Sequence, residues 1–261
     1  ESVALCDVSL LEGSYYKELM KTNLDYMMSL ETERLLYNYR KIAGLDTKGA
    51  SSYGAWIGST TGGAGHFEGT YMVALAKASR SIPDYSYNGE YPIERLTYMI
   101  GELKKCQDAY AQNHPEDAGY IGAISADAYD ALREGRNKDD LGANIWVPWY
   151  MCHKNYEAIY GVYMHVENAE LKALAYEMMS DFATWCYNDI SSIDETTRLA
   201  ILRTEYGGMG EVLMNIYKET GDSKHYYASK FFEEKGLLDN IYNGVDVLTG
   251  LHANTGIPKF L

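Results

Sequence analysis

The sequence is poor in positive charge and contains no long apolar run. Its 261 residues include 23 Lys and Arg against 37 Asp and Glu, which gives a formal net charge of −14. Nucleic acids and anionic membranes bind basic surfaces, so this balance argues against both as partners. No stretch of about 18 apolar residues is present, and no segment is predicted to cross a bilayer. A neutral ligand suits this composition better.

Cysteine is also scarce, and the few cysteines are widely spaced. They are Cys6, Cys106, Cys152 and Cys186, and no two of them have the C-x-x-C spacing of a metal knuckle. Cys152 and Cys186 lie among apolar and aromatic residues, which is typical of buried free thiols. The sequence therefore favours structural thiols over a disulfide, and favours metal ligands least.

Familiar local signatures of catalysis are missing as well. The chain has no P-loop, no G-x-G-x-x-G turn after a strand, no H-E-x-x-H helix and no Ser-His-Asp order. It has no signal peptide and begins at Glu1 without methionine, which indicates processing or truncation. Secreted and cytoplasmic locations both stay open, and secretion is favoured. The abrupt end at Leu261 indicates that the function belongs to a longer protein.

The sequence is instead rich in tyrosine and in helical periodicity. Its 25 tyrosines combine an apolar ring with a polar tip, which suits the edge of a helical core and, less often, a sugar-facing wall. Apolar residues recur at spacings of three and four, and strand signals are nearly absent. Asn168 and Asp222 are predicted to cap helices. Helices are predicted over residues 15–43, 66–80, 92–112, 149–166, 169–189, 209–220 and 223–235.

A helix–turn–helix unit recurs loosely along the chain. Residues 76–83, 162–168 and 216–222 each end one helix and begin the next. Repeated helical hairpins build a solenoid, a bundle or a ring of paired helices, and the irregular spacing disfavours the solenoid. We therefore expect an all-α fold in a single domain over residues 1–261, with long loops at 53–65 and 113–147.

Four short clusters mix polar, aromatic and glycine residues where helices are predicted to begin. They are Gly65–Tyr71 (GHFEGTY), Trp146–Lys154 (WVPWYMCHK), Glu205–Glu211 (EYGGMGE) and His252–Thr255 (HANT). Sugars are bound by such mixtures, because polar groups hold the hydroxyls and an aromatic face covers the apolar side of the ring. In a ring of helix pairs, the N-termini of the inner helices converge on one central pocket.

The candidate sugar-binding residues come from these clusters and from the preceding loop. They are His66, His153, His252, Glu205, Trp56, Trp149 and Tyr206. Structural alternatives stay open, since His66 could cap its helix and His153 could be a core histidine bonded to a carbonyl. Glu211 is explained as well by the helix dipole as by a ligand role. The other histidines are assigned to the surface, and these are His114, His165 and His225.

Gly207 and Gly208 are interpreted as backbone requirements. The turn between Glu205 and the next helix is expected to need a left-handed conformation or a close approach that only glycine tolerates.

The clusters, in this order, resemble the N-terminal half of the catalytic domain of the β-L-arabinofuranosidases of glycoside hydrolase families 127 and 146. The resemblance covers nearly the whole chain and is carried by Leu30–Leu36, Tyr39–Leu45, Gly65–Tyr71, Pro148–Lys154, Glu205–Glu211 and Leu251–Lys259. It implies an (α/α)6 barrel followed by β-sandwich domains, and retaining hydrolysis of terminal β-L-arabinofuranosyl residues in plant-type glycans. The family's nucleophile is a cysteine thiolate at a zinc site of three Cys and one Glu, with a Glu as acid/base.

The resemblance also implies what this chain does not supply. In the family, the zinc ligands and the acid/base follow the His-Ala-Asn-Thr motif, and none of the four cysteines here matches them. We therefore assign no catalytic residue, metal or cofactor to this chain, and expect zinc only in a full-length enzyme. Thr70 stands where many relatives have a second histidine, and Ile57 where a Glu is common.

The predicted role is thus the substrate-orienting part of a hydrolase pocket with a carbohydrate as partner. The alternative is a non-catalytic carbohydrate-binding protein derived from such a hydrolase. About eight or nine helices are predicted, fewer than the six pairs of a complete barrel. We expect an incomplete ring whose apolar edge binds further domains or a second copy of the chain.

Overall fold

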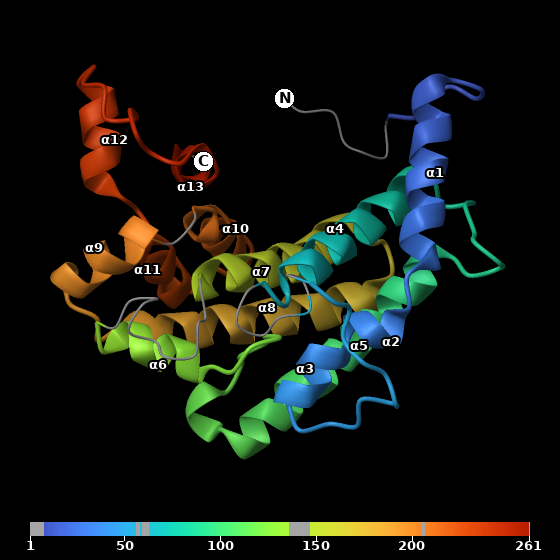
Figure 1. The fold of residues 1–261 in the computed structure, drawn as a ribbon, viewed down its shortest axis with the longest axis horizontal. Helices are drawn as coiled ribbons and strands as arrows, with labels where there is room; N and C mark the ends of the chain where they lie inside the picture. Colours follow the sequence, from blue (N-terminus) through green and yellow to red (C-terminus); the bar gives the residue numbers. More distant parts are fainter. Residues whose placement is uncertain (1–7, 56–57, 59–62, 136–146, 205–206, 261) are drawn as a thin grey trace.

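The computed structural model describes residues 8–55, 58, 63–135, 147–204 and 207–260, and this part of the chain is almost entirely helical (Figure 1). Within it there are thirteen α-helices and no strand beyond an isolated bridge between Tyr87 and Glu90. The helices are α1 (Tyr15–Ser29), α2 (Thr32–Leu35), α3 (Tyr37–Ile42), α4 (His66–Ser81), α5 (Pro92–Asn113), α6 (Asp127–Arg133), α7 (Pro148–His165), α8 (Ala169–Ile190), α9 (Glu195–Thr204), α10 (Met209–Thr220), α11 (Ser223–Phe231), α12 (Lys235–Tyr242) and α13 (Ala253–Gly256). The prediction of an all-α fold is confirmed.

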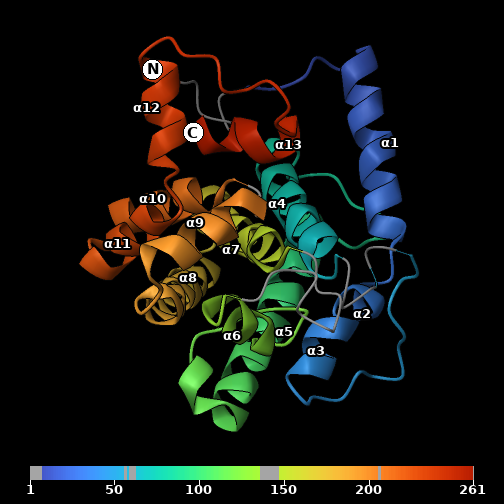
Figure 2. The same ribbon diagram turned by 60° about the vertical axis from the view of Figure 1, so that its left-hand side comes forward.

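Three helix pairs follow one another through the body of the molecule. They are α4 with α5, α7 with α8, and α10 with α11. The first helix of each pair packs beside the first helix of the next, so α7 lies between α4 and α10, while α8 packs against α5 and α11 (Figure 2). This arrangement of inner and outer helices is consistent with the all-α toroid that the family resemblance implies.

The central position of α7 follows from its composition. Buried residues cover most of the circumference of this helix, and Tyr150, Lys154 and Glu157 form a half-buried face. A helix with so wide a buried surface is one that other helices enclose. Glycine also allows α4 to approach closely, because a Cβ on Gly69 would lie 2.5 Å from the carbonyl carbon of Lys154.

Tyrosine and other aromatic residues form much of the core between α6, α7 and α8. Tyr156 stacks on Phe182 with ring centroids 3.7 Å apart, and Tyr129 meets Trp149 edge to face at 4.6 Å. The buried hydroxyl of Tyr129 donates to the carbonyl of Pro148 at 3.0 Å. A ring that packs and a hydroxyl that finds an acceptor explain why these positions hold tyrosine.

Both predicted caps are confirmed. The Asn168 side chain accepts the Leu171 amide at 2.9 Å at the start of α8, and Asp222 accepts the Lys224 amide at 2.8 Å at the start of α11. The prediction of one helix over 15–43 was wrong, because the backbone becomes extended at Leu30 and the segment divides into α1, α2 and α3. The predicted loop 113–147 contains α6, and α9 and α12 were not predicted.

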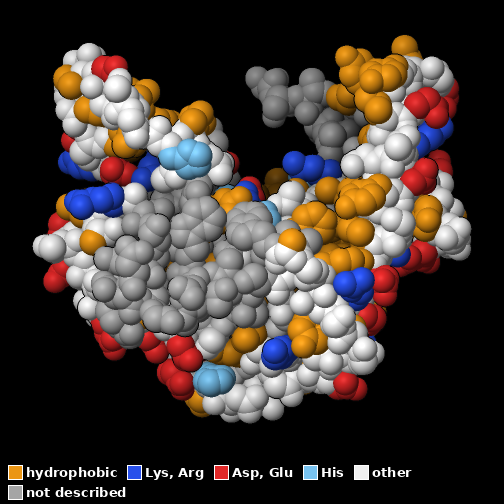
Figure 3. Space-filling view, viewed as in Figure 1, with side chains coloured by type: hydrophobic (Ala, Val, Ile, Leu, Met, Phe, Trp, Pro, Cys, Tyr) orange, Lys and Arg blue, Asp and Glu red, His pale blue; other side chains and the backbone are white. Residues whose placement is uncertain are grey.

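Helices α1 and α12 project from the body on opposite sides, and the space-filling view is hollowed between them (Figure 3). Apolar side chains gather on α1, where Tyr15 and Tyr16 are among the most exposed residues of the chain. None of the helices in the described ranges combines the length and apolar character that crossing a membrane requires.

Candidate functional site

Contacts join the four sequence clusters into one continuous region. His66 begins α4, and its ring stacks on Tyr150 of α7 with centroids 5.8 Å apart. His153, one turn further along α7, packs against Gly208, where an added Cβ would lie 2.6 Å from Nε2. The amide of Gly207 donates to the carbonyl of Thr255 at 3.2 Å. Each cluster therefore touches the next, in the order of α4, α7, α10 and α13.

His66 is half-buried and held in one orientation. Its Nδ1 lies 3.1 Å from the carbonyl of Gly63, which fixes Nδ1 as a donor in the neutral ring. Burial lowers the pKa of His66, and the nearby Lys154 ammonium acts in the same direction, although the bond to Gly63 opposes both. The ring is therefore neutral at pH 7. At the start of α4, the Glu68 carboxylate accepts the Gly65 amide at 3.0 Å.

His153 is 6 % exposed, and its environment keeps the ring neutral. Burial lowers its pKa to about 4, against the attraction of Glu157, whose carboxylate oxygen lies 3.6 Å from Nε2. Nδ1 has no hydrogen-bond partner among the described residues. An unpaired polar atom at this depth costs free energy unless a further group binds it. The interpretation of His153 as a core histidine bonded to a carbonyl is thus not what the structure shows.

His153 lines a cavity of about 180 Å³ between α4, α7 and α10. This volume is below the roughly 300–1,000 Å³ of sites for drug-sized ligands, and so it suits a small polar group. The polar lining residues are Lys77, His153, Glu157, Tyr160, His165, Glu211 and Asn215.

The two glycines before α10 meet the two requirements that the sequence predicted. Gly208 has φ of +118°, a conformation that L side chains rarely adopt. Gly207 lies so close to the C-terminal segment that a Cβ would stand 2.7 Å from the amide nitrogen of Lys259. Glu205 and Tyr206, which precede them, lie outside the described residues, as does Trp56.

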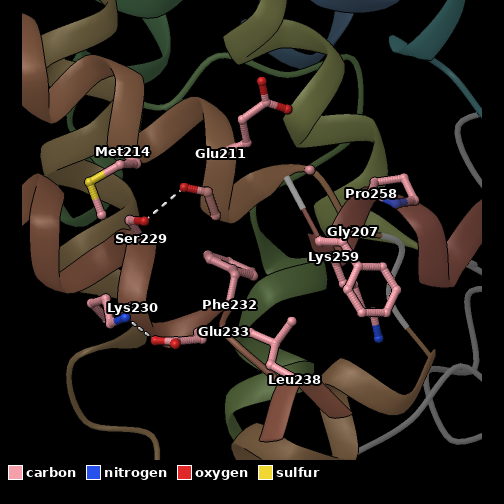
Figure 4. A pocket seen from close by; sticks show the side chains of 13 residues that line it. Gly207, Glu211, Met214, Ser229, Lys230, Phe232, Glu233, Leu238, Pro258 and Lys259 are labelled. Atoms are coloured by element: carbon pink, nitrogen blue, oxygen red, sulfur yellow. Dashed lines mark hydrogen bonds and ion pairs between the residues drawn. The ribbon is translucent and has the colours of Figure 1, made fainter. Parts of the chain in front are cut away.

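A second cavity of about 220 Å³ lies on the other side of α10 (Figure 4). It is bounded by α10, α11, α12 and the short helix over residues 257–260. Lys259 anchors that short helix, since its ammonium donates to the Leu202 carbonyl at 2.8 Å and to Glu234 at 2.6 Å. Glu211 borders both cavities, and Figure 4 shows its carboxylate directed away from Phe232 and Leu238.

The remaining candidates are placed differently. His252 is exposed at the start of α13, and its cluster joins the region through Thr255. Trp149 is fully buried between Tyr129 and Phe232, with centroids 4.6 and 5.2 Å away. The structure therefore places Trp149 in the aromatic core, and not at a wall that a sugar could reach.

The assignment of His225 to the surface was wrong. Its ring is 0 % exposed, with Nε2 3.2 Å from the Thr184 hydroxyl and Nδ1 2.8 Å from the Thr220 hydroxyl. Helix α11 packs against both α8 and α10, so the histidine side of α11 faces inward. Both ring nitrogens are satisfied by threonine, which gives His225 a structural role.

The described cysteines do not fit a zinc site. Cys106, Cys152 and Cys186 are free, buried thiols on α5, α7 and α8. Burial raises the pKa of Cys106 to about 12 and also raises the pKa of Cys186, so both thiols are protonated at pH 7. The three thiols lie on separate helices, and zinc needs ligands that converge on one point. In the described part of the chain, the one group of three possible ligands within mutual reach is His114, Glu116 and Asp117, which includes no cysteine.

The comparison with known proteins points to the same family as the sequence clusters and the paired helices. No curated protein matches this sequence significantly. A family model described as β-L-arabinofuranosidase, GH127 catalytic domain, matches residues 7–261. The chain therefore belongs to this family of arabinofuranosidase-type glycoside hydrolases.

Proposed function

We propose that this chain forms the substrate-orienting part of a glycoside hydrolase pocket that receives a terminal β-L-arabinofuranosyl group. The observation that carries the proposal is the run of contacts from His66 through Tyr150 and His153 to Gly208. It gathers two neutral imidazoles and an aromatic ring at the start of neighbouring inner helices.

Neutral imidazole suits a sugar because one ring nitrogen donates and the other accepts, as a hydroxyl does. His66 and His153 both have lowered pKa values, so a pH near 7 leaves them in this form. Tyr150 adds a ring face beside His66, and the ammonium of Lys154 lies 5.6 Å from the centre of that ring. The imidazoles would bind the hydroxyl groups of a furanose, and the Tyr150 ring would contact the apolar side of the sugar.

Hydrolysis needs a nucleophile and an acid/base on either side of the scissile bond. The protonated thiols of Cys106 and Cys186 do not supply the first. Binding of the sugar without turnover is therefore the expected behaviour of the chain on its own. The same observation favours the second candidate function, a non-catalytic carbohydrate-binding protein related to the hydrolases.

The test is a calorimetric titration with methyl β-L-arabinofuranoside, with the α-anomer as the comparison ligand. We expect saturable binding that favours the β-anomer and becomes about tenfold weaker in His66→Ala and in His153→Gln. His114→Ala is the control, because this ring stacks on Tyr110 away from the site. Equal affinity for the two anomers, or no loss in either variant, would refute the proposal.

A further inference from the structure

A buried polar network lies directly beneath His66 and connects three helices. The Tyr39 hydroxyl on α3 donates to Oδ1 of Asn155 on α7 at 2.5 Å, and it lies 3.3 Å from the carbonyl of Gly65. Asn155 in turn donates to the Met151 carbonyl at 3.0 Å. From α4, Glu68 accepts the amide of Gly65 at 3.0 Å. Tyr39, Glu68 and Asn155 are all nearly inaccessible to solvent.

The network converges on Gly65, the residue before His66. Gly65 has φ of +95°, its amide donates to Glu68, and its carbonyl accepts the Gly69 amide at 3.0 Å and lies 3.3 Å from the Tyr39 hydroxyl. A Cβ at this position would lie 3.3 Å from the Tyr39 hydroxyl and 3.4 Å from Nδ2 of Asn155. The two peptide groups that flank Gly65 are therefore both in contact with buried side chains, and a larger residue than glycine would crowd them.

Burying this network at the start of a helix costs free energy that an exposed cap does not. An exposed Ser, Asp or Asn would cap α4 without burying a carboxyl group, as Asn168 does for α8. Burial raises the pKa of Glu68 to about 7, although the amides of Gly65 and of Glu68 itself oppose the rise. Because the fold resists the ionisation of Glu68, this residue is better explained by the groups it positions than by a contribution to stability.

We propose that Tyr39, Glu68 and Asn155 are positioning residues that fix the two peptide groups flanking Gly65, and thereby the direction in which the His66 ring meets its ligand. This inference rests on the proposed function for the role of His66. The geometry of the ring itself is a property of the free protein, so it is measured without any sugar.

Glu68 would also make this end of the site respond to pH near neutrality. The titratable groups around it are Tyr39 on α3, Cys106 on α5 near Tyr39, His66 on α4, and Lys154 on α7 near His66. Burial raises the pKa of Tyr39 and of Cys106, so both stay protonated, and the pKa of His66 is lowered. A change in the His66 ring centred near pH 7 would therefore report the ionisation of Glu68.

The first experiment follows the ring nitrogens of His66 by long-range ¹H–¹⁵N NMR on the sugar-free chain. In wild-type protein, the nitrogen shifts of His66 should change with an inflection near pH 7. Glu68→Gln should remove this inflection. It should keep the nitrogen shifts of one tautomer, because Gln still accepts the Gly65 amide. Glu68→Ala should lose the fixed tautomer. Tyr39→Phe should also alter the ring signals, and it serves if the alanine variant does not fold.

The matched control is Glu94, which caps α5 in the same way by accepting the Tyr91 amide at 2.9 Å. Glu94→Gln and Glu94→Ala should leave the His66 signals unchanged. The inference is overturned if His66 is unaffected by Glu68→Ala and by Tyr39→Phe in folded protein, or if the Glu94 variants shift it equally.

The second experiment repeats the titration with methyl β-L-arabinofuranoside. Glu68→Gln should remove the pH dependence of the affinity near neutrality, and Tyr39→Phe should weaken binding about tenfold. If His66 responds in the first experiment but no variant or wild-type chain binds the sugar, the positioning role stands and the proposed function fails.

Discussion

Gly208 and His153 lie in direct contact although they belong to different helix pairs. A single added methyl group on Gly208 would stand 2.6 Å from Nε2 of the histidine. The start of α10 therefore rests on the imidazole, and the glycine is required both by this contact and by its φ of +118°.

Replacing Gly208 by alanine should destabilise the protein and disturb the site together. The strained backbone costs about 1–2 kcal/mol, and the overlap with the His153 ring adds to it. Gly221→Ala is the matched control, because φ there is +69° but nothing lies within 4 Å of the added carbon. Urea denaturation should show a larger loss for Gly208→Ala. Equal losses would mean that the contact with His153 has no energetic weight.

His153 should make the protein less stable in mild acid. Its pKa is about 4 in the folded chain and about 6.5 when unfolded, so the unfolded state binds more protons between these values. Its contribution is complete above pH 6.5 and is lost as the pH falls towards 4, by roughly 2–3 kcal/mol. His153→Gln should flatten this part of the curve of unfolding free energy against pH.

Glu68 should act in the opposite sense over an overlapping range. Its folded pKa of about 7 lies above the ordinary value of 4.5, so its stabilising effect is present below 4.5 and is lost as the pH rises to 7. Comparing Glu68→Gln with His153→Gln separates the two slopes. An unchanged slope between pH 4.5 and 7 in Glu68→Gln would show that this carboxyl ionises normally.

Removing Glu102 should leave the buried charge of Arg40 with one carboxylate partner, Glu33, in place of two. The Arg40 guanidinium is almost inaccessible, and its Nη2 donates to Glu102 at 2.7 Å while Nε donates at 3.0 Å. Glu102→Ala is expected to cost about 3 kcal/mol, whereas Glu18→Ala, which breaks an exposed pair with Lys21, should cost less than about 0.5 kcal/mol. Chemical denaturation of both variants measures the difference.

The chain on its own is predicted to carry no stoichiometric zinc and to hydrolyse no aryl β-L-arabinofuranoside at an appreciable rate. The physical reason is that the described thiols are buried and that Cys106 and Cys186 are protonated. Elemental analysis and a chromogenic assay on the purified chain are the measurements. Zinc together with turnover that disappears on mutating Cys152 or Cys186 would contradict the prediction.

Long helices could be predicted from sequence because their signal is local. The start of α8 at Ala169 and of α11 at Ser223 follows from the side chains that cap them, Asn168 and Asp222. Helix α6 has buried residues at Ala128, Tyr129, Ala131 and Leu132, a helical pattern too short to stand out from the surrounding loop.

Burial was harder to predict, because it depends on neighbours from distant segments. Trp149 was predicted to face a sugar, but in the folded protein Tyr129 and Phe232 enclose it. His225 looks like a surface residue until α8 brings Thr184 to its ring. The hydrogen bond between Tyr39 and Asn155 joins residues 116 positions apart, and the role of Glu68 was not predicted because it depends on this distant pair.

The close approach of α4 to α7 at Gly69 has a consequence for selectivity. Main-chain atoms of Lys154 lie against Gly69, so the separation of the two helix starts is set by backbone and not by adaptable side chains. In the proposed site, the spacing between His66 and His153 is therefore fixed by the backbone. A ligand whose hydroxyl groups match that spacing binds without a free-energy cost for rearranging the protein. A ligand whose hydroxyl groups are spaced differently cannot be accommodated by a change of rotamer alone.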